Sequence, residues 1–371
     1  MINLMLLGNV HAEIVPILYA AHLIALTKKD GGLCVTTAYC EALEYPTQER
    51  RVEGSQGDRD DKQKIQPIII VHGGAGDIAN SKVQGKLDGV KLAVIAGQEV
   101  LNRGGSALDA VEAAVVSMEK DDNFNAGYGS VLNLRGEVEM EASMMSGTNL
   151  DVGAVTLIKD FPHPISIAHK VLTESPHAFL GGEGAKLFAL EKGFTTVPPE
   201  SLISGNAREA LRKFLVHGEL GRAEDEGGVG TVGAVAIDAQ GSVAVATSTG
   251  GINGKAVGRI GDTPQIGSGS YADDKIGGVS ITGHGESILK FCLAHSIIKL
   301  MEDGANANTA TMNAVNAMTA RLNNTAGVIT LSNKGEVGIH FSSNRMSWAY
   351  VKDNKIFYGI EHGQVLEEPY K

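Results

Sequence analysis

The apolar positions of the chain fall into short runs that predict β-strands. A fully apolar run, PIIIVHGG at residues 67–74, predicts a buried strand that ends in glycine. Two β-branched runs, TVGAVAID and VAVATST, are separated by Ala239, Gln240 and Gly241, and this arrangement predicts a β-hairpin. Similar runs predict strands at residues 152–159, 328–332, 337–342, 347–351 and 355–358.

Helical periodicity occupies several of the intervals between these strands. It predicts helices at residues 86–102, 106–120, 184–192, 207–217, 286–302 and 307–321. Ser106 is placed to cap the second of these helices, with Asp109 at the third helical position. The order of strands and helices predicts an α+β fold in which antiparallel sheets are sandwiched between helical layers.

Two segments lack the apolar residues that a folded segment needs. Residues 48–64 contain one apolar residue, Val52, in seventeen positions, and residues 218–229 are acidic and rich in glycine. Neither segment can bury enough apolar surface to offset the entropy lost on ordering. We therefore expect a flexible linker at 48–64, a folded body that begins near Gln66, and a disordered stretch before residue 230.

The N-terminal extension, residues 1–65, contains an apolar run of 13 residues from Ile14 to Leu26. This run is too short to span a bilayer. A secretory signal would carry basic residues before its apolar core, but the first basic residue of the chain is Lys28. We expect a cytoplasmic protein with no membrane partner, and a signal or anchor in the extension stays open as the alternative.

Composition and charge narrow the classes of function. The chain has 371 residues, of which 43% are hydrophobic and 20% charged, so it can form a substantial core. Its formal charge of -11 disfavours nucleic acid as a partner, because a phosphate backbone would be repelled. The cysteines, Cys34, Cys40 and Cys292, have neither zinc-ligand nor redox-motif spacing, which indicates free thiols in a reducing compartment.

Several common catalytic motifs are missing from the chain. No serine has glycine both two positions before and two positions after it, as the nucleophile elbow of a serine hydrolase requires. The histidines lack the H-E-x-x-H spacing of zinc hydrolases, so no catalytic metal is expected. The segment HGGAGD lacks the third glycine of a dinucleotide-binding turn, which favours a tight turn over a phosphate-binding loop.

The segment Gly230-Thr231-Val232-Gly233 offers a different nucleophile. A threonine hydroxyl needs a base beside it, and a threonine at a chain N-terminus carries its own base, the α-amine. This chemistry requires that the peptide bond between Gly230 and Thr231 is cleaved. Glycine at position 230 leaves the scissile carbonyl unhindered and permits strained dihedral angles. The alternative is that Thr231 only begins a strand.

Further polar residues follow Thr231 at positions beside glycine. Thr249 ends the second strand of the hairpin, and Thr282 lies just before a helix. Hydroxyls and backbone N–H groups at such positions suit an oxyanion and a bound water. In the loop GRIGD, Arg259 can bind a carboxylate and Asp262 an ammonium, so together they could hold an amino acid. The alternatives are ordinary strand or cap threonines and an exposed ion pair.

Eight motifs in order resemble those of the plant-type L-asparaginase and isoaspartyl peptidase family. They are HGGAGD, FNAGYGSVLN, EMEASMM, GTVGAVA, ATSTGG, GRIGDTP, GSGSYAD and TGHGES, and the resemblance runs from about Gln66 to the C-terminus. It implies the four-layer αββα fold of N-terminal-nucleophile hydrolases and self-cleavage before Thr231. The products would be an α chain, residues 66–230 with the extension before it, and a β chain, residues 231–371, assembled as a homodimer of αβ units.

The resemblance also implies an activity and the residues of the reacting centre. The activity is hydrolysis of L-asparagine to L-aspartate and ammonia, together with cleavage of β-aspartyl (isoaspartyl) dipeptides, without an organic cofactor. Thr231 would be the nucleophile, and Thr249 a neighbouring hydroxyl that assists cleavage and catalysis. Thr282 and Gly283 would supply the oxyanion contacts.

Other positions acquire binding and supporting roles from the same resemblance. Arg259 and Asp262 would bind the carboxylate and the amine of the substrate, and Gly285 would line the substrate pocket. Asn125 would contact the scissile region, and the turn from His72 to Gly76 would support the geometry of self-cleavage. The loop around FNAGYGS resembles a family element that holds a sodium ion on backbone carbonyls.

Two features depart from the family pattern. The first 65 residues have no counterpart in it, and GTVG stands where lysosomal glycosylasparaginases have D-T-I-G. Hydrolysis of glycosylated asparagine is therefore the second hypothesis. A third hypothesis, from another class, is a non-catalytic binding protein that keeps the fold and stays uncut.

Overall fold

The computed structural model describes residues 24–29, 32–37, 66–218 and 230–371. The chain divides into two compact units, Met1–Asp60 and Asp61–Lys371. In the first unit, β1 (Ile24–Lys29) and β2 (Gly32–Thr37) pair as an antiparallel hairpin. The linker expected at 48–64 and nearly all of the stretch expected before residue 230 lie outside the described residues.

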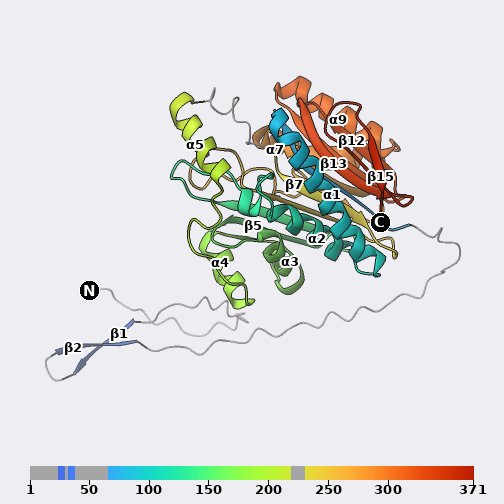
Figure 1. Cartoon of the computed structure of the whole chain (residues 1–371). Helices are drawn as coiled ribbons and strands as arrows, with labels where there is room; N and C mark the ends of the chain where they lie inside the picture. The colour runs from blue at the N-terminus through green and yellow to red at the C-terminus, as the bar shows by residue number, and fades with distance from the viewer. Residues whose placement is uncertain (1–23, 30–31, 38–65, 219–229) are drawn as a thin grey trace, which may run out of the picture. The chain divides into compact units, whose positions relative to one another are not determined.

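The second unit is built around a nine-stranded sheet (Figure 1). The strand order is β15-β14-β13-β3-β7-β8-β4-β5-β6, and the pairs are antiparallel except for β5 with β6. The strands are β3 (Ile68–Gly76), β4 (Met140–Ser146), β5 (Val152–Ile158), β6 (Phe179–Gly181), β7 (Val232–Ile237), β8 (Val243–Thr249), β13 (Arg345–Lys352), β14 (Lys355–Gly359) and β15 (Leu366–Pro369). The predicted hairpin is confirmed as β7 and β8, which lie near the centre of the sheet.

A second, four-stranded antiparallel sheet packs against the first. Its order is β12-β11-β10-β9, with β9 (Ser270–Asp273), β10 (Gly277–Gly283), β11 (Ala326–Ser332) and β12 (Val337–Phe341). Ile70, Val235 and Val245 of the large sheet share one buried core with Ile329 and Leu331 of the small sheet. The faces of the two sheets that meet are therefore apolar, and together they form the inner double layer.

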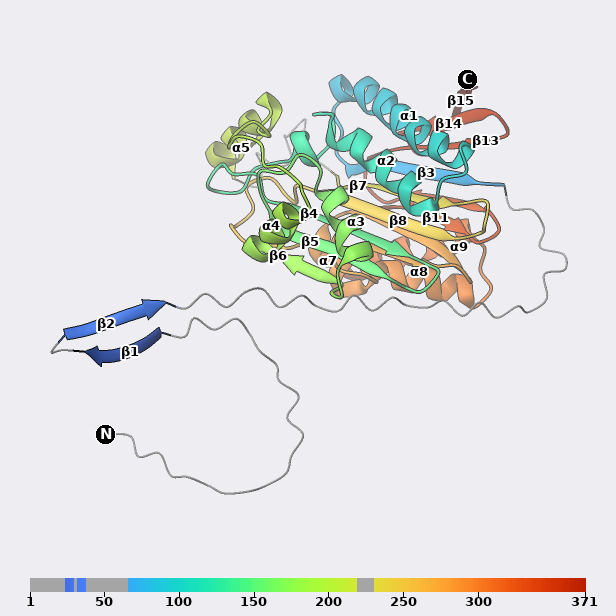
Figure 2. The ribbon, with the colours of Figure 1, turned by 90° about the horizontal axis from the view of Figure 1, so that it is seen from below.

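Helices cover the outer face of each sheet. The large sheet carries α1 (Asn80–Asn102), α2 (Ala107–Glu119), α3 (Pro164–Glu174) and α4 (Gly182–Glu191), whereas the small sheet carries α7 (Gly285–Phe291), α8 (Leu293–Glu302) and α9 (Ala307–Leu322). Helix α5 (Gly205–His217) joins the core of the large sheet through Ala207 and Leu211 and lies beyond one end of the strands (Figure 1). Figure 2 shows α1 and α2 on one side of the strands and α8 and α9 on the other. The predicted four-layer αββα sandwich is confirmed.

Two local predictions about helices met different outcomes. Ser106 caps α2 as predicted, because its Oγ accepts a hydrogen bond of 3.1 Å from the backbone N–H of Asp109. The single helix predicted at 286–302 is wrong, since Cys292 has a left-handed φ of +51° and separates α7 from α8. Cys292 carries an exposed free thiol.

Strand β4 has no clear strand signal in the sequence. Its residues, MEASMMS, include the helix formers Met, Glu and Ala, yet it pairs with β5 on one side and β8 on the other. Pairing and burial in the sheet outweigh the local preference. No helix in the described part of the chain is long and apolar enough to cross a membrane.

Candidate active site

Thr231 is buried directly before β7, near the middle of the large sheet. The register sets Val232 opposite Ser248, so its continuation by one residue would set Thr231 opposite Thr249. The hydroxyl oxygen of Thr231 lies 3.5 Å from that of Thr263. Thr263 belongs to the GRIGDTP motif, but the sequence alone assigned it no role.

Gly230 lies against the glycine segment, His72–Gly76, which is the last part of β3. The tight turn predicted there is wrong, because these residues stay in the strand and pair with β13 across an irregularity in its register. Its φ is +103°, a backbone conformation that favours glycine. A Cβ at this position would lie 2.2 Å from Cα of Gly74 and 2.7 Å from the backbone nitrogen of Ala75. Gly230 is thus in contact with the glycine segment that the resemblance connected with self-cleavage.

Thr282 contacts the same glycine segment of β3 from the small sheet. It is buried in β10, and its Oγ1 accepts a hydrogen bond of 3.2 Å from the backbone N–H of Ala75. The next residue, Gly283, has a φ of +133°. Thr249 of β8 accepts a hydrogen bond of 2.9 Å from the N–H of Gly251. The two sheets therefore bring hydroxyls of distant parts of the sequence to one end of the double layer.

Asn125 fixes the loop that follows β8. Its Nδ2 donates to the carbonyl of Gly251 at 2.7 Å, and its Oδ1 accepts from the N–H of Val131 at 3.0 Å. A Cβ on Gly250 would meet Asn125 Oδ1 at 2.6 Å, so the two loops are in close contact. The hydrogen bonds of the Asn125 side chain thus position the glycines directly after Thr249.

The side chains of Arg259 and Asp262 converge on Gly285, the first residue of α7. A Cβ on Gly285 would lie 2.7 Å from Arg259 Nη2 and 2.7 Å from Asp262 Oδ1. Asp262 is buried, and its Oδ2 has no hydrogen-bond partner among the described residues. The alternative of an exposed ion pair is therefore wrong. A buried carboxylate without a partner favours the approach of a donor or a cation.

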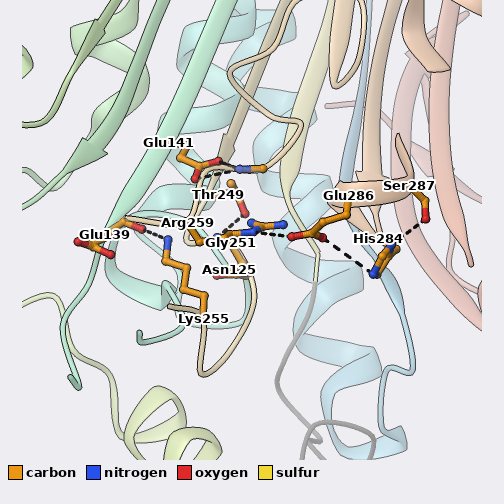
Figure 3. A network of polar contacts seen from close by, with 11 residues as sticks. Asn125, Glu139, Glu141, Thr249, Gly251, Lys255, Arg259, His284, Glu286 and Ser287 are labelled. Atoms are coloured by element: carbon orange, nitrogen blue, oxygen red, sulfur yellow. Dashed lines mark hydrogen bonds and ion pairs between the residues drawn. The ribbon is translucent and has the colours of Figure 1, made fainter. Parts of the chain in front are cut away.

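Glu286 occupies the other side of Arg259 and lies between Arg259 and His284 (Figure 3). Arg259 Nε donates to Glu286 Oε1 at 3.0 Å, and Glu286 Oε2 lies 3.9 Å from His284 Nε2. Arg259 therefore forms its salt bridge with Glu286 and keeps its Nη2 directed toward Gly285. Glu286 was not singled out from the sequence, although it lies within the TGHGES motif.

Further charged groups are buried behind Arg259 (Figure 3). Glu141 accepts from the N–H of Gly261 at 3.0 and 3.2 Å, and Lys255 Nζ donates to the carbonyl of Glu139 at 2.6 Å. Burial lowers the pKa of Lys255 to about 8 and raises that of Glu141, and the attraction between the two charges opposes both shifts. These partners lie far apart in sequence, so no local pattern indicated them.

Two titratable groups have environments that limit their chemistry. Burial raises the pKa of Asp262 to about 7, an effect that the positive charge of Arg259 opposes. Burial lowers the pKa of His72 to about 3, and its Nε2 lies 2.9 Å from Ser280 Oγ. His72 is therefore neutral at physiological pH and is too weakly basic to titrate near pH 7.

Candidate cation ligands lie in two other places. Asp109, Glu112 and His169 on α2 and α3 have ligand atoms within 4.8 Å of one another, with His169 Nδ1 already 2.6 Å from Glu112. In the FNAGYGS loop, a Cβ on Gly127 would lie 2.3 Å from the carbonyl oxygen of Glu119, and one on Gly129 would lie 2.0 Å from that of Phe124. These distances show that the loop is tightly packed at both glycines.

Comparison with known proteins gives consistent matches over the folded body. The family model described as Asparaginase matches residues 65–360. A probable isoaspartyl peptidase/L-asparaginase of Drosophila melanogaster is 47% identical over 326 residues, covering 82% of this chain and 98% of its own. The isoaspartyl peptidase/L-asparaginases of Xenopus laevis and Homo sapiens are 48% and 43% identical, and the matches cover 81% and 80% of this chain and 97% of theirs.

Proposed function

Because the chain belongs to the asparaginase family, we propose that it is an amidohydrolase that hydrolyses L-asparagine and cleaves β-aspartyl dipeptides, with Thr231 as the nucleophile. The family resemblance inferred from the eight motifs is confirmed. One observation carries the assignment of the site: Arg259 and Asp262 converge on Gly285, and the residue after Asp262 contacts Thr231.

The first step that we propose is cleavage of the chain by its own threonine. The Thr231 hydroxyl oxygen attacks the carbonyl carbon of Gly230, and the peptide nitrogen of Thr231 leaves that carbon as an amine. An ester then joins the two residues, and water hydrolyses it. This releases the carboxylate of Gly230 and leaves Thr231 with a free hydroxyl and a free α-amine. The contact of Gly230 with Gly74 supports this step, because it holds the scissile peptide against the backbone of β3.

In the mature enzyme the α-amine of Thr231 takes the proton from its own hydroxyl. The oxygen attacks the side-chain carbonyl carbon of asparagine or of a β-aspartyl peptide, and the leaving amine departs with a proton. Water then hydrolyses the aspartyl ester. Thr282 and the N–H of Gly283 stabilise the negative oxygen that forms during both steps. Thr249 assists as a neighbouring hydroxyl, and Asn125 keeps the loop after it in place.

The amino-acid end of the substrate lies at Gly285 in this proposal. Arg259 Nη2 pairs with its α-carboxylate and Asp262 with its α-ammonium, since both groups face the space beside Gly285. A side chain at position 285 would fill that space. The buried Oδ2 of Asp262, which has no partner among the described residues, supports this role because it gains one from the substrate.

The remaining features of the proposal concern assembly and ions. The mature protein is a homodimer of αβ units that acts on small substrates in the cytoplasm, without nucleic-acid or membrane partners. It needs no organic cofactor, and the resemblance of the FNAGYGS loop to the family element supports a structural sodium ion held on backbone carbonyls.

A denaturing gel and N-terminal sequencing test this function directly. We expect a 230-residue chain and a 141-residue chain that begins at Thr231, the latter of roughly 15 kDa. The variant Thr231→Ala should remain one chain, and processing of that variant at the same bond would refute self-cleavage. Aspartate release from L-asparagine, β-aspartyl dipeptides and glycosylated asparagine then separates the proposed activity from a glycosylasparaginase. A wild-type chain that stays uncut would indicate a binding protein.

A further inference from the structure

Lys86 is a lysine of α1 whose side chain is directed into the protein. The residue is 4% exposed, and its Nζ donates a hydrogen bond of 2.9 Å to the carbonyl of Gly73. The same Nζ lies 4.9 Å from the centre of the Phe124 ring. A buried ammonium group is rare unless it is paired, because its removal from water is unfavourable.

No charged group in the described part of the chain forms a close ion pair with Lys86. Burial lowers its pKa to about 7, while Asp121 favours the charged form and Lys82 disfavours it. Asp77 and Asp122 line the small cavity that Lys86 also lines. The close contacts of the ammonium group are therefore the carbonyl of Gly73 and the ring of Phe124, and they indicate a role in holding the backbone at Gly73.

Gly73 belongs to the glycine segment, His72–Gly76, in the last part of β3. The ring of Phe124 lies where a side chain of Gly73 would be, since a Cβ there would be 2.3 Å from Phe124 Cε1. The next residue, Gly74, has a φ of +101°. Lys86 of α1 and Phe124 of the loop after α2 thus fix the peptide between Gly73 and Gly74.

The next peptide, between Gly74 and Ala75, is held from the side of the small sheet. Its N–H, at Ala75, donates to Thr282 Oγ1 at 3.2 Å, and Gly230 packs directly on Gly74 and Ala75. Movement of the Gly73 carbonyl would rotate the peptide between Gly74 and Ala75 and shift the backbone atoms on which Gly230 packs. The hydrogen bond of Lys86 is therefore linked to the scissile peptide through two consecutive peptide groups.

We propose that Lys86 is a positioning residue for self-cleavage. It holds the glycine segment of β3 in the conformation that supports Gly230 beside the attacking hydroxyl of Thr231. This inference rests on the proposed cleavage before Thr231. Lys86 acts through Gly73 and Gly74, and it touches neither the substrate pocket at Gly285 nor Arg259. Its contribution ends when the bond is cut, so it affects maturation more strongly than turnover.

The experiment compares the full chain with Lys86→Met, which keeps the length of the side chain and removes the donor. The chains are made by cell-free synthesis, and the cut fraction is followed on denaturing gels. We expect self-cleavage of Lys86→Met to be about tenfold slower, the effect of losing one charge-assisted hydrogen bond. The kcat/KM of its mature fraction for L-asparagine should stay within about twofold of the wild type. Lys82→Met, which removes a charge beside the same cavity, is the matched control and should cleave normally.

A second variant separates positioning from packing. Lys86→Gln retains an N–H donor and should cleave faster than Lys86→Met, whereas a defect of packing would slow both variants in proportion to their loss of melting temperature. Cleavage of Lys86→Met at the wild-type rate, equal slowing in Lys82→Met, or a purely proportional loss overturns the proposal. If Lys86→Met does not fold, the comparison of Lys86→Gln with the wild type and Lys82→Met decides. A wild-type chain that stays uncut would instead refute the proposed function.

Discussion

The hydroxyl oxygens of Thr231 and Thr263 lie 3.5 Å apart, although 32 residues separate the two threonines in sequence. Thr263 directly follows Asp262, so its hydroxyl contact links Thr231, the proposed nucleophile, to the residue proposed to bind the substrate ammonium. A hydroxyl at this distance can accept from or donate to the Thr231 oxygen after a small movement. This relationship leads to the first prediction.

Thr263→Val should slow self-cleavage or turnover by about fivefold, the equivalent of one neutral hydrogen bond of about 1 kcal/mol. Thr263→Ser keeps the hydroxyl and is the matched control. Gel time courses and kcat of the cleaved protein measure the two steps. Equal rates for the valine variant and the wild type would show that the hydroxyl of Thr263 has no part in either step.

Arg259→Ala should weaken substrate capture much more than maturation, because Arg259 faces Gly285 and not Gly230. We expect a loss of about 2 to 5 kcal/mol in kcat/KM for L-asparagine, typical of a buried charge-assisted contact. Glu286→Gln serves as a comparison, since it removes the charge that pairs with Arg259 Nε and leaves the guanidinium in place. An unchanged kcat/KM in a fully cleaved Arg259→Ala protein would remove Arg259 from the site.

Gly285→Ala should block the substrate pocket while the chain still cuts itself. The added Cβ would lie 2.7 Å from both Arg259 Nη2 and Asp262 Oδ1, which is closer than van der Waals contact allows. KM should rise more than about tenfold. Gly184→Ala in α4 is the control, because nothing lies within 4 Å of its Cβ position. If both variants bind L-asparagine normally, the substrate lies elsewhere.

The pKa of Asp262 predicts how KM depends on pH. Because burial raises that pKa to about 7, the empty site holds mostly neutral Asp262 below pH 7 and mostly carboxylate above it. The substrate ammonium pairs with the carboxylate, so binding must release a proton at low pH. KM for L-asparagine should therefore rise as the pH falls from about 7 toward 5. Asp262→Asn should bind weakly at all pH values, and a dependence identical to the wild type would contradict this assignment.

The α-amine of Thr231 predicts a different effect of pH, on kcat at saturating substrate. Activity should rise as the amine loses its proton, with a midpoint at or below the reference pKa of about 7.7 to 8.0. His72 is not expected to produce this limb, since burial lowers its pKa to about 3. The kcat profiles of His72→Asn and His284→Asn, in cleaved protein, test the point. Disappearance of the limb in either variant would identify a histidine as the base.

Local patterns in the sequence determined most of the fold. The β-branched runs around Ala239 to Gly241 gave the central hairpin, and Ser106 with Asp109 gave the start of α2, because turns and caps depend on neighbouring residues. The sequence also proposed Thr231 as the nucleophile, since it lies between a polar glycine-rich stretch and a strand. The left-handed residue Cys292 and the strand β4 were missed, because packing and pairing override local preference there.

Only the tertiary structure decided which side chains meet around these residues. Thr263 lies beside Thr231, Glu286 pairs with Arg259, and Lys86 holds Gly73. Some of these residues occur in motifs that are visible in the sequence, but the motifs do not rank them. A hydrogen bond depends on distances that the packing of two sheets and a helix determines. Lys86 shows the limit most clearly. In the sequence it is one lysine on an amphipathic helix. Only in the folded protein is its ammonium group buried against the glycine segment of β3, where it donates a hydrogen bond to Gly73.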